Sequence, residues 1–203
     1  MRLAKVLGSF VLVLGLAQPA AASGPTAESF MKDRQGELSA LVKKSSVPGN
    51  SKKIETVFDS ILDYEALAKG SLRAQWEPRT DAERKEFQDV LKQLVQRAYR
   101  KNLDHTASYD VRFDGESQEE ATFVVRTVAQ SRTNAREEPI SIDYVVHKDG
   151  TSFRIQDIIT EGSSLVGNYH QQFSRIIKKD GFGELLRRMK TKLSSGEANA
   201  ARP

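Results

Sequence analysis

The hydrophobic period of the chain changes halfway through the segment 153–173, FRIQDIITEGSSLVGNYHQQF. Before Gly162 the apolar residues share one parity, which predicts a strand with one buried face. After Gly162 they recur every three or four positions, which predicts an amphipathic helix. Between the two, Gly162 can take a positive φ, and either Ser163 or Ser164 can cap the first helical turn. We therefore expect a strand that runs directly into a helix. The apolar strand positions are Phe153, Ile155 and Ile159.

Asp157 has the same parity as these apolar strand residues, so the pattern predicts a carboxylate that needs partners. We expect it to accept hydrogen bonds from the backbone of the turn or from an Arg, and so to hold the strand and the helix together. The alternative is a general base in a cleft, paired with Tyr144 as the acid, as in hydrolases or isomerases with a conical α+β sheet.

The first half of the chain has helical spacing throughout. Helices are expected over 26–44 and 52–62, and Asp63 can cap a short third helix. Thr80 and Glu83 form a capping box before the most regular helix, 81–102, which is apolar along one whole face. A last helix is expected over 182–193. Its basic face is typical of a solvated surface, with contact to anionic lipid or an acidic partner as the alternative.

Four segments after residue 108 alternate between apolar and polar residues and predict strands over 109–113, 121–129, 140–147 and 153–159. Asp149 and Gly150 supply a hairpin turn. Short polar links between consecutive strands predict an antiparallel meander, and the chain as a whole an α+β fold with a four-stranded sheet and several packed helices. The parity expected to face water contains Arg126, Ser141, Asp143, His147, Arg154 and Gln156.

The first 22 residues have the features of a secretory signal peptide: basic Arg2 and Lys5, an apolar run over 6–16 and an Ala20-Ala21-Ala22 cleavage site. We expect an exported single domain over 23–193 and a disordered tail over 194–203. Without Arg2 and Lys5 the 31 basic residues become 29, against 27 acidic ones, so the alkaline charge balance gives no support to nucleic-acid binding.

Composition also limits the chemistry of the chain. Cysteine is absent, which excludes thiol nucleophiles, disulfides and Cys-metal sites. The histidines His105, His147 and His170 share no metal-ligand spacing, so no metal is expected. No Gly-rich phosphate loop occurs either, and no cofactor is expected.

Two motifs resemble the MlaC family of periplasmic phospholipid-binding proteins, also called the toluene-tolerance auxiliary family. The first is the strand 155–159 followed by Glu161-Gly162-Ser163-Ser164-Leu165, then Asn168-Tyr169 and Phe173. The second is Phe58-Asp59 through Asp63-Tyr64, then Trp76 and the helix from Phe87 to Tyr99. Together they span nearly the whole chain after residue 22, in the order of the family.

The resemblance implies a curved, NTF2-like sheet with helices against it, enclosing an apolar pocket for the tails of a diacyl phospholipid. It implies a monomeric, non-enzymatic carrier in the periplasm, which shuttles lipid between an outer-membrane lipoprotein complex and the substrate-receiving subunit of an inner-membrane ABC transporter. The ligand alternative is a hopanoid-like lipid. A chaperone-like binder of apolar segments is a further alternative and would have an open groove.

Apolar stripes form plain core more often than ligand walls, so the resemblance is what singles out the wall residues. A lipid carrier predicts a deep, dry, apolar cavity and an Asp157 bonded to its own turn, whereas an enzyme predicts polar groups converging on Asp157. The expected lipid-binding residues are Val57, Phe58, Ile61, Leu91, Leu94, Val95, Tyr99, Phe123, Val125, Ile142, Tyr144, Val146, Leu165, Val166 and Tyr169.

Overall fold

The computed structural model describes residues 24–44, 47–106 and 108–195, with residues 101–106 described by their backbone alone. The expected signal peptide and residues 196–203 of the expected tail lie outside the described residues. The helices are α1 (Ala27–Val42), α2 (Asn50–Ile61), α3 (Tyr64–Leu72), α4 (Asp81–Thr106), α5 (Leu165–Asp180) and α6 (Phe182–Ser194), with a short 3₁₀ helix η1 (Arg73–Gln75). The strands are β1 (Tyr109–Glu119), β2 (Thr122–Ser131), β3 (Ile140–Asp149), β4 (Ser152–Thr160) and β5 (Ser163–Ser164).

The α+β fold and the antiparallel meander are confirmed, but the sheet has five strands rather than four, in the order β1-β2-β3-β4-β5. The two-residue strand β5 is too short to leave a periodic pattern. Strand β1 also continues six residues beyond the predicted end at Phe113. Its pairing with β2 is irregular between Phe113 and Glu116, where Gly115 has φ +99°, and this break interrupts the alternation on which the prediction relied.

A bulge in β4 corrects the predicted face of two residues. Val146 pairs with Ile155 and Val145 with Asp157, so Gln156 is an extra residue between them. The parity therefore reverses after Ile155. As a result Ile158 lies on the same side of the sheet as Tyr144, whereas Asp157 and Ile159 lie on the opposite side, where the sequence had not placed them.

The parity expected to face water is only partly exposed. Arg126 and Ser141 are exposed, but the other four residues are half-buried. His147 and Arg154 are covered because the junction between α2 and α3 runs along β4, where the Asp63 N–H donates to the Ile155 carbonyl at 2.9 Å. His147 Nε2 lies 2.8 Å from Asp63 Oδ2, and Arg154 donates to the Leu62 carbonyl at 3.2 Å.

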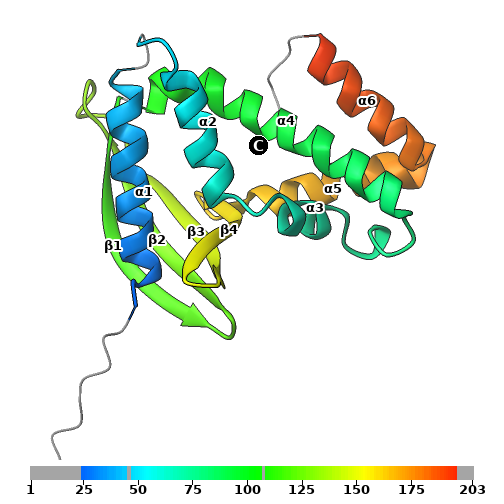
Figure 1. The fold of residues 1–203 in the computed structure, drawn as a ribbon, viewed down its shortest axis with the longest axis horizontal. Helices are drawn as coiled ribbons and strands as arrows, with labels where there is room; N and C mark the ends of the chain where they lie inside the picture. Colours follow the sequence, from blue (N-terminus) through cyan, green and yellow to red (C-terminus); the bar gives the residue numbers. More distant parts are fainter. Residues whose placement is uncertain (1–23, 45–46, 107, 196–203) are drawn as a thin grey trace, which may run out of the picture.

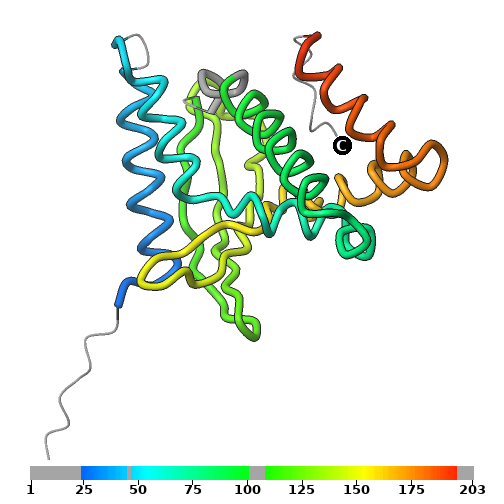
Figure 2. The backbone as a smooth tube through the Cα atoms, turned by 45° about the vertical axis from the view of Figure 1, so that its right-hand side comes forward, coloured from blue at the N-terminus to red at the C-terminus, as the bar shows by residue number. Residues whose placement is uncertain are grey.

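The helices form two groups around the sheet (Figure 1). Helix α1 lies across β1 and β2, and α2 packs on α1 and β4. Helices α3, α4, α5 and α6 pack together beside the sheet, as the tube view also shows (Figure 2). At the centre of the second group the ring of Phe87 lies 5.6 Å from that of Phe173 and 6.0 Å from that of Phe182.

The predicted helix caps are confirmed. The Thr80 N–H donates to Glu83 Oε2 at 2.9 Å and the Glu83 N–H to Thr80 Oγ1 at 3.2 Å, which is the reciprocal pair of a capping box. Asp63 accepts from the Ala66 N–H at 2.8 Å at the start of α3. These local bonds explain why the helix starts could be predicted.

Candidate functional site

A row of apolar side chains between α2, α4 and the sheet is only half-buried, although all of them but Ile142 pack against the hydrophobic core. Phe58 on α2 stacks on Tyr99 of α4, with ring centroids 3.5 Å apart. Val95 lies one helical turn before Tyr99, and the charge of the Tyr144 side chain on β3 reaches Tyr99. We call this row the seam; its residues are Phe58, Val95, Tyr99, Ile142, Tyr144 and Ile158.

Helical spacing on α4 and strand pairing in the sheet bring the seam residues onto facing surfaces. Val95 and Tyr99 share a face of α4 because they are four residues apart. On the sheet, Ile142 and Tyr144 are two residues apart on β3 and both point to the helix-facing side. Ile158 of β4 points to the same side, because it is paired with Tyr144. Ile158 faces this side only because of the bulge at Gln156. The seam is therefore apolar on both of its sides.

The tyrosines of the seam are held in the neutral form. Burial raises the pKa of Tyr144 to about 12, and burial, together with repulsion from Tyr144 once that phenol is ionised, raises the pKa of Tyr99 to about 12. Neither hydroxyl makes a hydrogen bond to another residue of the described chain. Both residues are half-buried, and neither hydroxyl oxygen is among the fully buried polar atoms without a partner, so water or a polar group of a ligand can reach them.

A polar network joins α2 to α4 beside the seam. Asp59 accepts from Tyr64 and from Gln96, both at 2.8 Å, and pairs with Lys92 at 2.7 Å. Partial burial acts to raise the pKa of Asp59, but the bonds from Lys92, Tyr64 and Gln96 together outweigh it and hold the pKa below its ordinary value. Burial and the bond to Asp59 raise the pKa of Tyr64.

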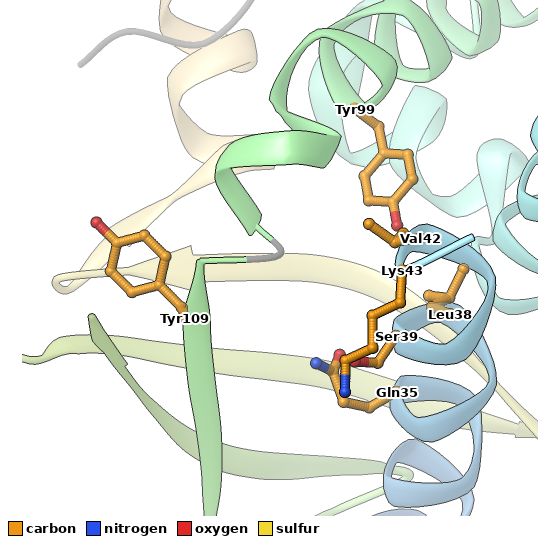
Figure 3. A pocket seen from close by; sticks show the side chains of 7 residues that line it. All are labelled: Gln35, Leu38, Ser39, Val42, Lys43, Tyr99 and Tyr109. Carbon is orange, nitrogen blue, oxygen red and sulfur yellow. The ribbon is translucent and has the colours of Figure 1, made fainter. Parts of the chain in front are cut away.

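A small, partly open hollow lies at one end of the seam, between α1, α4 and β1. Figure 3 shows Tyr99 reaching from α4 toward Val42 and Lys43 at the end of α1. The hollow has a volume of about 30 Å³. That is room for one water and not for a hydrocarbon chain. It is lined by Gln35, Leu38, Ser39, Val42, Lys43, Tyr99 and Tyr109.

An open groove of about 610 Å³ lies between α1 and α2. Its volume is within the range of small-molecule sites, roughly 300–1,000 Å³. Ala40, Leu41 and Val57 give it apolar walls, and Lys52 and Lys53 lie at its end by the start of α2. The remaining lining residues are Glu37, Gly49 and Thr56.

The structure distributes the predicted wall residues over several places. Five of them meet in the seam: Phe58, Val95, Tyr99, Ile142 and Tyr144. Val57 borders the groove, and the fully packed core contains Ile61, Leu91, Leu94, Val125 and Val146. The others lie elsewhere: Phe123 against Phe153, and Leu165, Val166 and Tyr169 on α5. A contact with lipid remains a prediction for each residue.

On α5 the predicted residues pack against protein. A Cβ on Gly70 of α3 would lie 2.7 Å from Val166 Cγ1, so α3 and α5 approach each other through that glycine. The ring of Tyr169 stacks on Phe173 at 5.2 Å, nearly parallel at 7°. This end of α5 therefore joins two helices more closely than it borders a hollow.

The turn between β4 and α5 is held by Asp157. Its Oδ1 accepts from the Ile158 N–H at 2.8 Å and from the Val166 N–H at 3.0 Å, and its Oδ2 accepts from Ser164 Oγ at 2.5 Å. Gly162 has φ +72°, and Ser164 Oγ caps α5 by accepting from the Gly167 N–H at 2.8 Å. Because Asp157 and Tyr144 lie on opposite faces of the sheet, the two cannot act as an acid and base pair.

Sequence reasoning did not place Ile158, Ala40 or Leu41 at the site. The helical spacing of α1 contained the signal for Leu41, whereas nothing in the sequence indicated the reversal that brings Ile158 inward. Within the described ranges, no three His, Cys, Asp or Glu side chains are grouped as metal ligands would be. Nor does any helix of the described part have the length and apolar character needed to cross a bilayer.

The family model of the MlaC protein matches residues 36–191, which is more than half of the chain. The chain belongs to the MlaC family. Among solved structures, the phospholipid-binding protein from Ralstonia solanacearum, determined in complex with a phospholipid, matches with a TM-score of 0.71 at 23% identity, covering 85% of this chain and 99% of that one. At that identity the match supports the fold of this MlaC protein. No curated protein matches the chain.

Proposed function

We propose that this MlaC protein is a periplasmic carrier that holds the acyl chains of one phospholipid in the seam and the spaces that border it. The observation that carries the proposal is the seam itself, a row of half-buried apolar side chains that includes two neutral tyrosines. Membership of the MlaC family and the fold shared with a phospholipid-binding protein support the same ligand class.

Energetics require such a protein to shield the tails completely. Two chains of about 16 carbons contain roughly 30 methylenes, whose transfer from water is worth about 25 kcal/mol at ~0.8 kcal/mol each. A lipid that moves from a bilayer into the seam exchanges one apolar surrounding for another, so the step is close to neutral. Direction then comes from partners, which we propose to be an outer-membrane lipoprotein complex and the substrate-receiving subunit of an inner-membrane ABC transporter.

The closed form of the seam implies that loading is coupled to movement. The hollow at the end of the seam, about 30 Å³, is smaller than a chain, so in this proposal α4 moves away from α2 and the sheet to let the tails enter. Among the described residues, the Phe58–Tyr99 contact, the Asp59 network and the Glu55–Arg100 ion pair join α2 to α4 at this boundary. Entry of the tails replaces one set of apolar contacts with another and keeps the energetic difference between the two forms small.

Lipid content tests the proposal. The protein is purified from its own periplasm without detergent, analysed by native mass spectrometry and extracted. We expect close to one diacyl lipid per chain; recovery of a polycyclic lipid would identify the hopanoid alternative. Val95→Trp fills the seam and should lower the lipid content several-fold, whereas Gln93→Trp, on the exposed side of the same helix, should not. Empty wild-type protein with turnover of a small ester would overturn the carrier in favour of the enzyme.

A further inference from the structure

The turn between α1 and α2 has an unusual charge pattern. We define the α1–α2 tip as Lys43, Lys44, Val47, Pro48, Gly49, Lys52 and Lys53. It carries four lysines and no acidic residue. The backbone of Lys44 closes the turn, because its carbonyl accepts from the Val47 N–H at 3.0 Å and from Asn50 Nδ2 at 2.7 Å. The lysines at the end of α1 and at the start of α2 are thereby brought together.

These lysines are not neutralised by the described part of the protein. All four are exposed, and none forms an ion pair with a described residue. The neighbouring acids have partners of their own: Glu37 pairs with Arg34 at 2.7 Å, Glu55 with Arg100 at 2.9 Å, and Asp110, whose charge reaches Lys43, with Arg132 at 2.7 Å. The 132–139 loop at the same end carries two Arg and two Glu, so the excess charge there comes from the tip.

The apex of the tip is apolar. Val47 is 48% exposed and is the exposed large hydrophobic residue of the described chain, and Pro48 beside it is exposed as well. Helix α2 then begins at Asn50, with Gly49 at its N-cap, without a side-chain cap and without an acid in its first turn, so its dipole adds to the positive potential. An apolar apex within a ring of lysines matches the boundary between the head groups and the chains of a bilayer.

Both hollows of the site open beside this tip. Val42 and Lys43 line the small hollow, and Gly49, Lys52 and Lys53 line the groove. The tip lies at one end of the molecule, away from the β1–β2 hairpin (Figure 1). A surface held against the tip would therefore face the groove and the end of the seam together.

We propose that the α1–α2 tip docks this protein on the surface of an anionic lipid bilayer. The lysines bind lipid phosphates, Val47 enters the interface, and the groove faces the membrane, so lipid can be exchanged without passing through water. This inference deepens the proposed carrier function and rests on it. An acidic protein is less suited to the tip, because a specific protein interface buries roughly 800 Å² on each partner, whereas a few cations and one apolar anchor suffice for a bilayer.

Vesicle flotation of the full chain without its first 22 residues tests the docking. Wild-type protein should bind vesicles of phosphatidylglycerol and phosphatidylcholine, bind pure phosphatidylcholine vesicles far less, and lose binding as salt is added. Each Lys→Gln change in the tip should lower the partition constant by about fivefold, which corresponds to ~1 kcal/mol per cation. The test variant is Lys44→Gln, Lys52→Gln and Lys53→Gln combined.

A matched control removes the same charge from α5. Arg175, Lys178 and Lys179 are exposed there and form no ion pair with a described residue. The combined change of all three to Gln should leave most of the vesicle binding intact. Equal losses in both triple variants would overturn the docking surface, because binding would then follow net charge alone.

A fluorescent label locates the contact, since the chain contains no cysteine. An environment-sensitive dye on Val47→Cys should shift to the blue with anionic vesicles, whereas the same dye on Thr151→Cys, in the β3–β4 turn at the other end of the sheet, should not. A response at Thr151→Cys alone overturns the proposal, as does a wild-type protein that binds an acidic protein but no vesicle.

Lipid content separates the two proposals. Lys44→Gln changes the tip lysine that lines neither hollow, so this variant, loaded in a detergent-free extract, should still contain lipid by native mass spectrometry although it docks about fivefold less. If wild-type protein contains lipid but does not bind anionic vesicles, the docking proposal is overturned and the carrier proposal stands. If wild-type protein contains no lipid, the carrier proposal is overturned.

Discussion

Phe58 and Tyr99 form the contact between α2 and α4 at the seam, with ring centroids 3.5 Å apart and planes inclined at 32°. They come from helices on either side of the proposed lipid path. Neither ring is fully buried. The contact between the two rings therefore closes the seam between α2 and α4 but leaves its side chains only half-buried.

A double-mutant cycle on this pair reports whether the seam opens. Phe58→Leu and Tyr99→Leu should show a coupling of about 0.5–1.5 kcal/mol in lipid-free protein, because each removes the ring that the other stacks on. In lipid-loaded protein the coupling should fall toward zero, since the acyl chains separate the rings. The measurement is the free energy of unfolding by urea in both states. Equal coupling in the two states would mean that lipid binds somewhere else.

Tyr144 predicts a loss of stability at alkaline pH. Its pKa in the folded protein, about 12, is above the ordinary value of 10.0, so the folded state holds the proton more tightly than the unfolded chain does. Its contribution is complete below pH 10 and is lost as the pH rises from 10 to about 12, on the order of 1–3 kcal/mol. Tyr144→Phe should flatten this part of the stability curve.

The ultraviolet absorbance of tyrosinate gives an independent reading of the same group. One late-titrating tyrosine should disappear in Tyr144→Phe. Bound lipid should delay the titration of Tyr144 further, because it removes the remaining access of water to the seam. If lipid leaves the titration unchanged, Tyr144 does not line the ligand site.

Gly70 predicts a steric conflict that a second mutation relieves. Gly70→Ala places a Cβ 2.7 Å from Val166 Cγ1 and should destabilise the protein by about 1–3 kcal/mol. Val166→Ala in the same chain removes the obstructing methyl groups and should restore part of that loss. Gly36→Ala is the control: it lies within α1 with nothing within 4 Å, and should stabilise by about 0.5–1 kcal/mol. Thermal unfolding of the four proteins checks both directions.

Asp157 should matter for stability rather than for chemistry. Asp157→Ala leaves the Ile158 and Val166 N–H groups without their acceptor and should lower the free energy of unfolding by about 2–3 kcal/mol. Asp157→Asn keeps one acceptor oxygen and should cost about half as much. Asp143→Ala, on the same face of the sheet but without a hydrogen bond to a described residue, should change stability by less than about 0.5 kcal/mol. Ester turnover that depended on Asp157 would contradict this assignment.

Short-range chemistry made most elements predictable. The capping box of Thr80 and Glu83 and the cap of α3 by Asp63 join residues three positions apart, so the sequence alone contains both partners of each bond. The family resemblance, read from the β4–α5 turn and the α2–α4 motifs, likewise needed no coordinates, and the match over residues 36–191 confirms it.

The sequence by itself therefore determined the elements except β5, their order and the family, because these depend on neighbours along the chain. Tertiary structure alone decided which apolar residues stay half-covered. Tyr99 meets Phe58 and Tyr144 only after α4 has been placed against α2 and the sheet. The bulge at Gln156 exchanged Ile159 for Ile158 where both are apolar and no pattern distinguishes them. The burial of a residue depends on how close segments far apart in the chain come to lie. Periodicity indicates which face of an element a residue is on, but not which other element packs against that face.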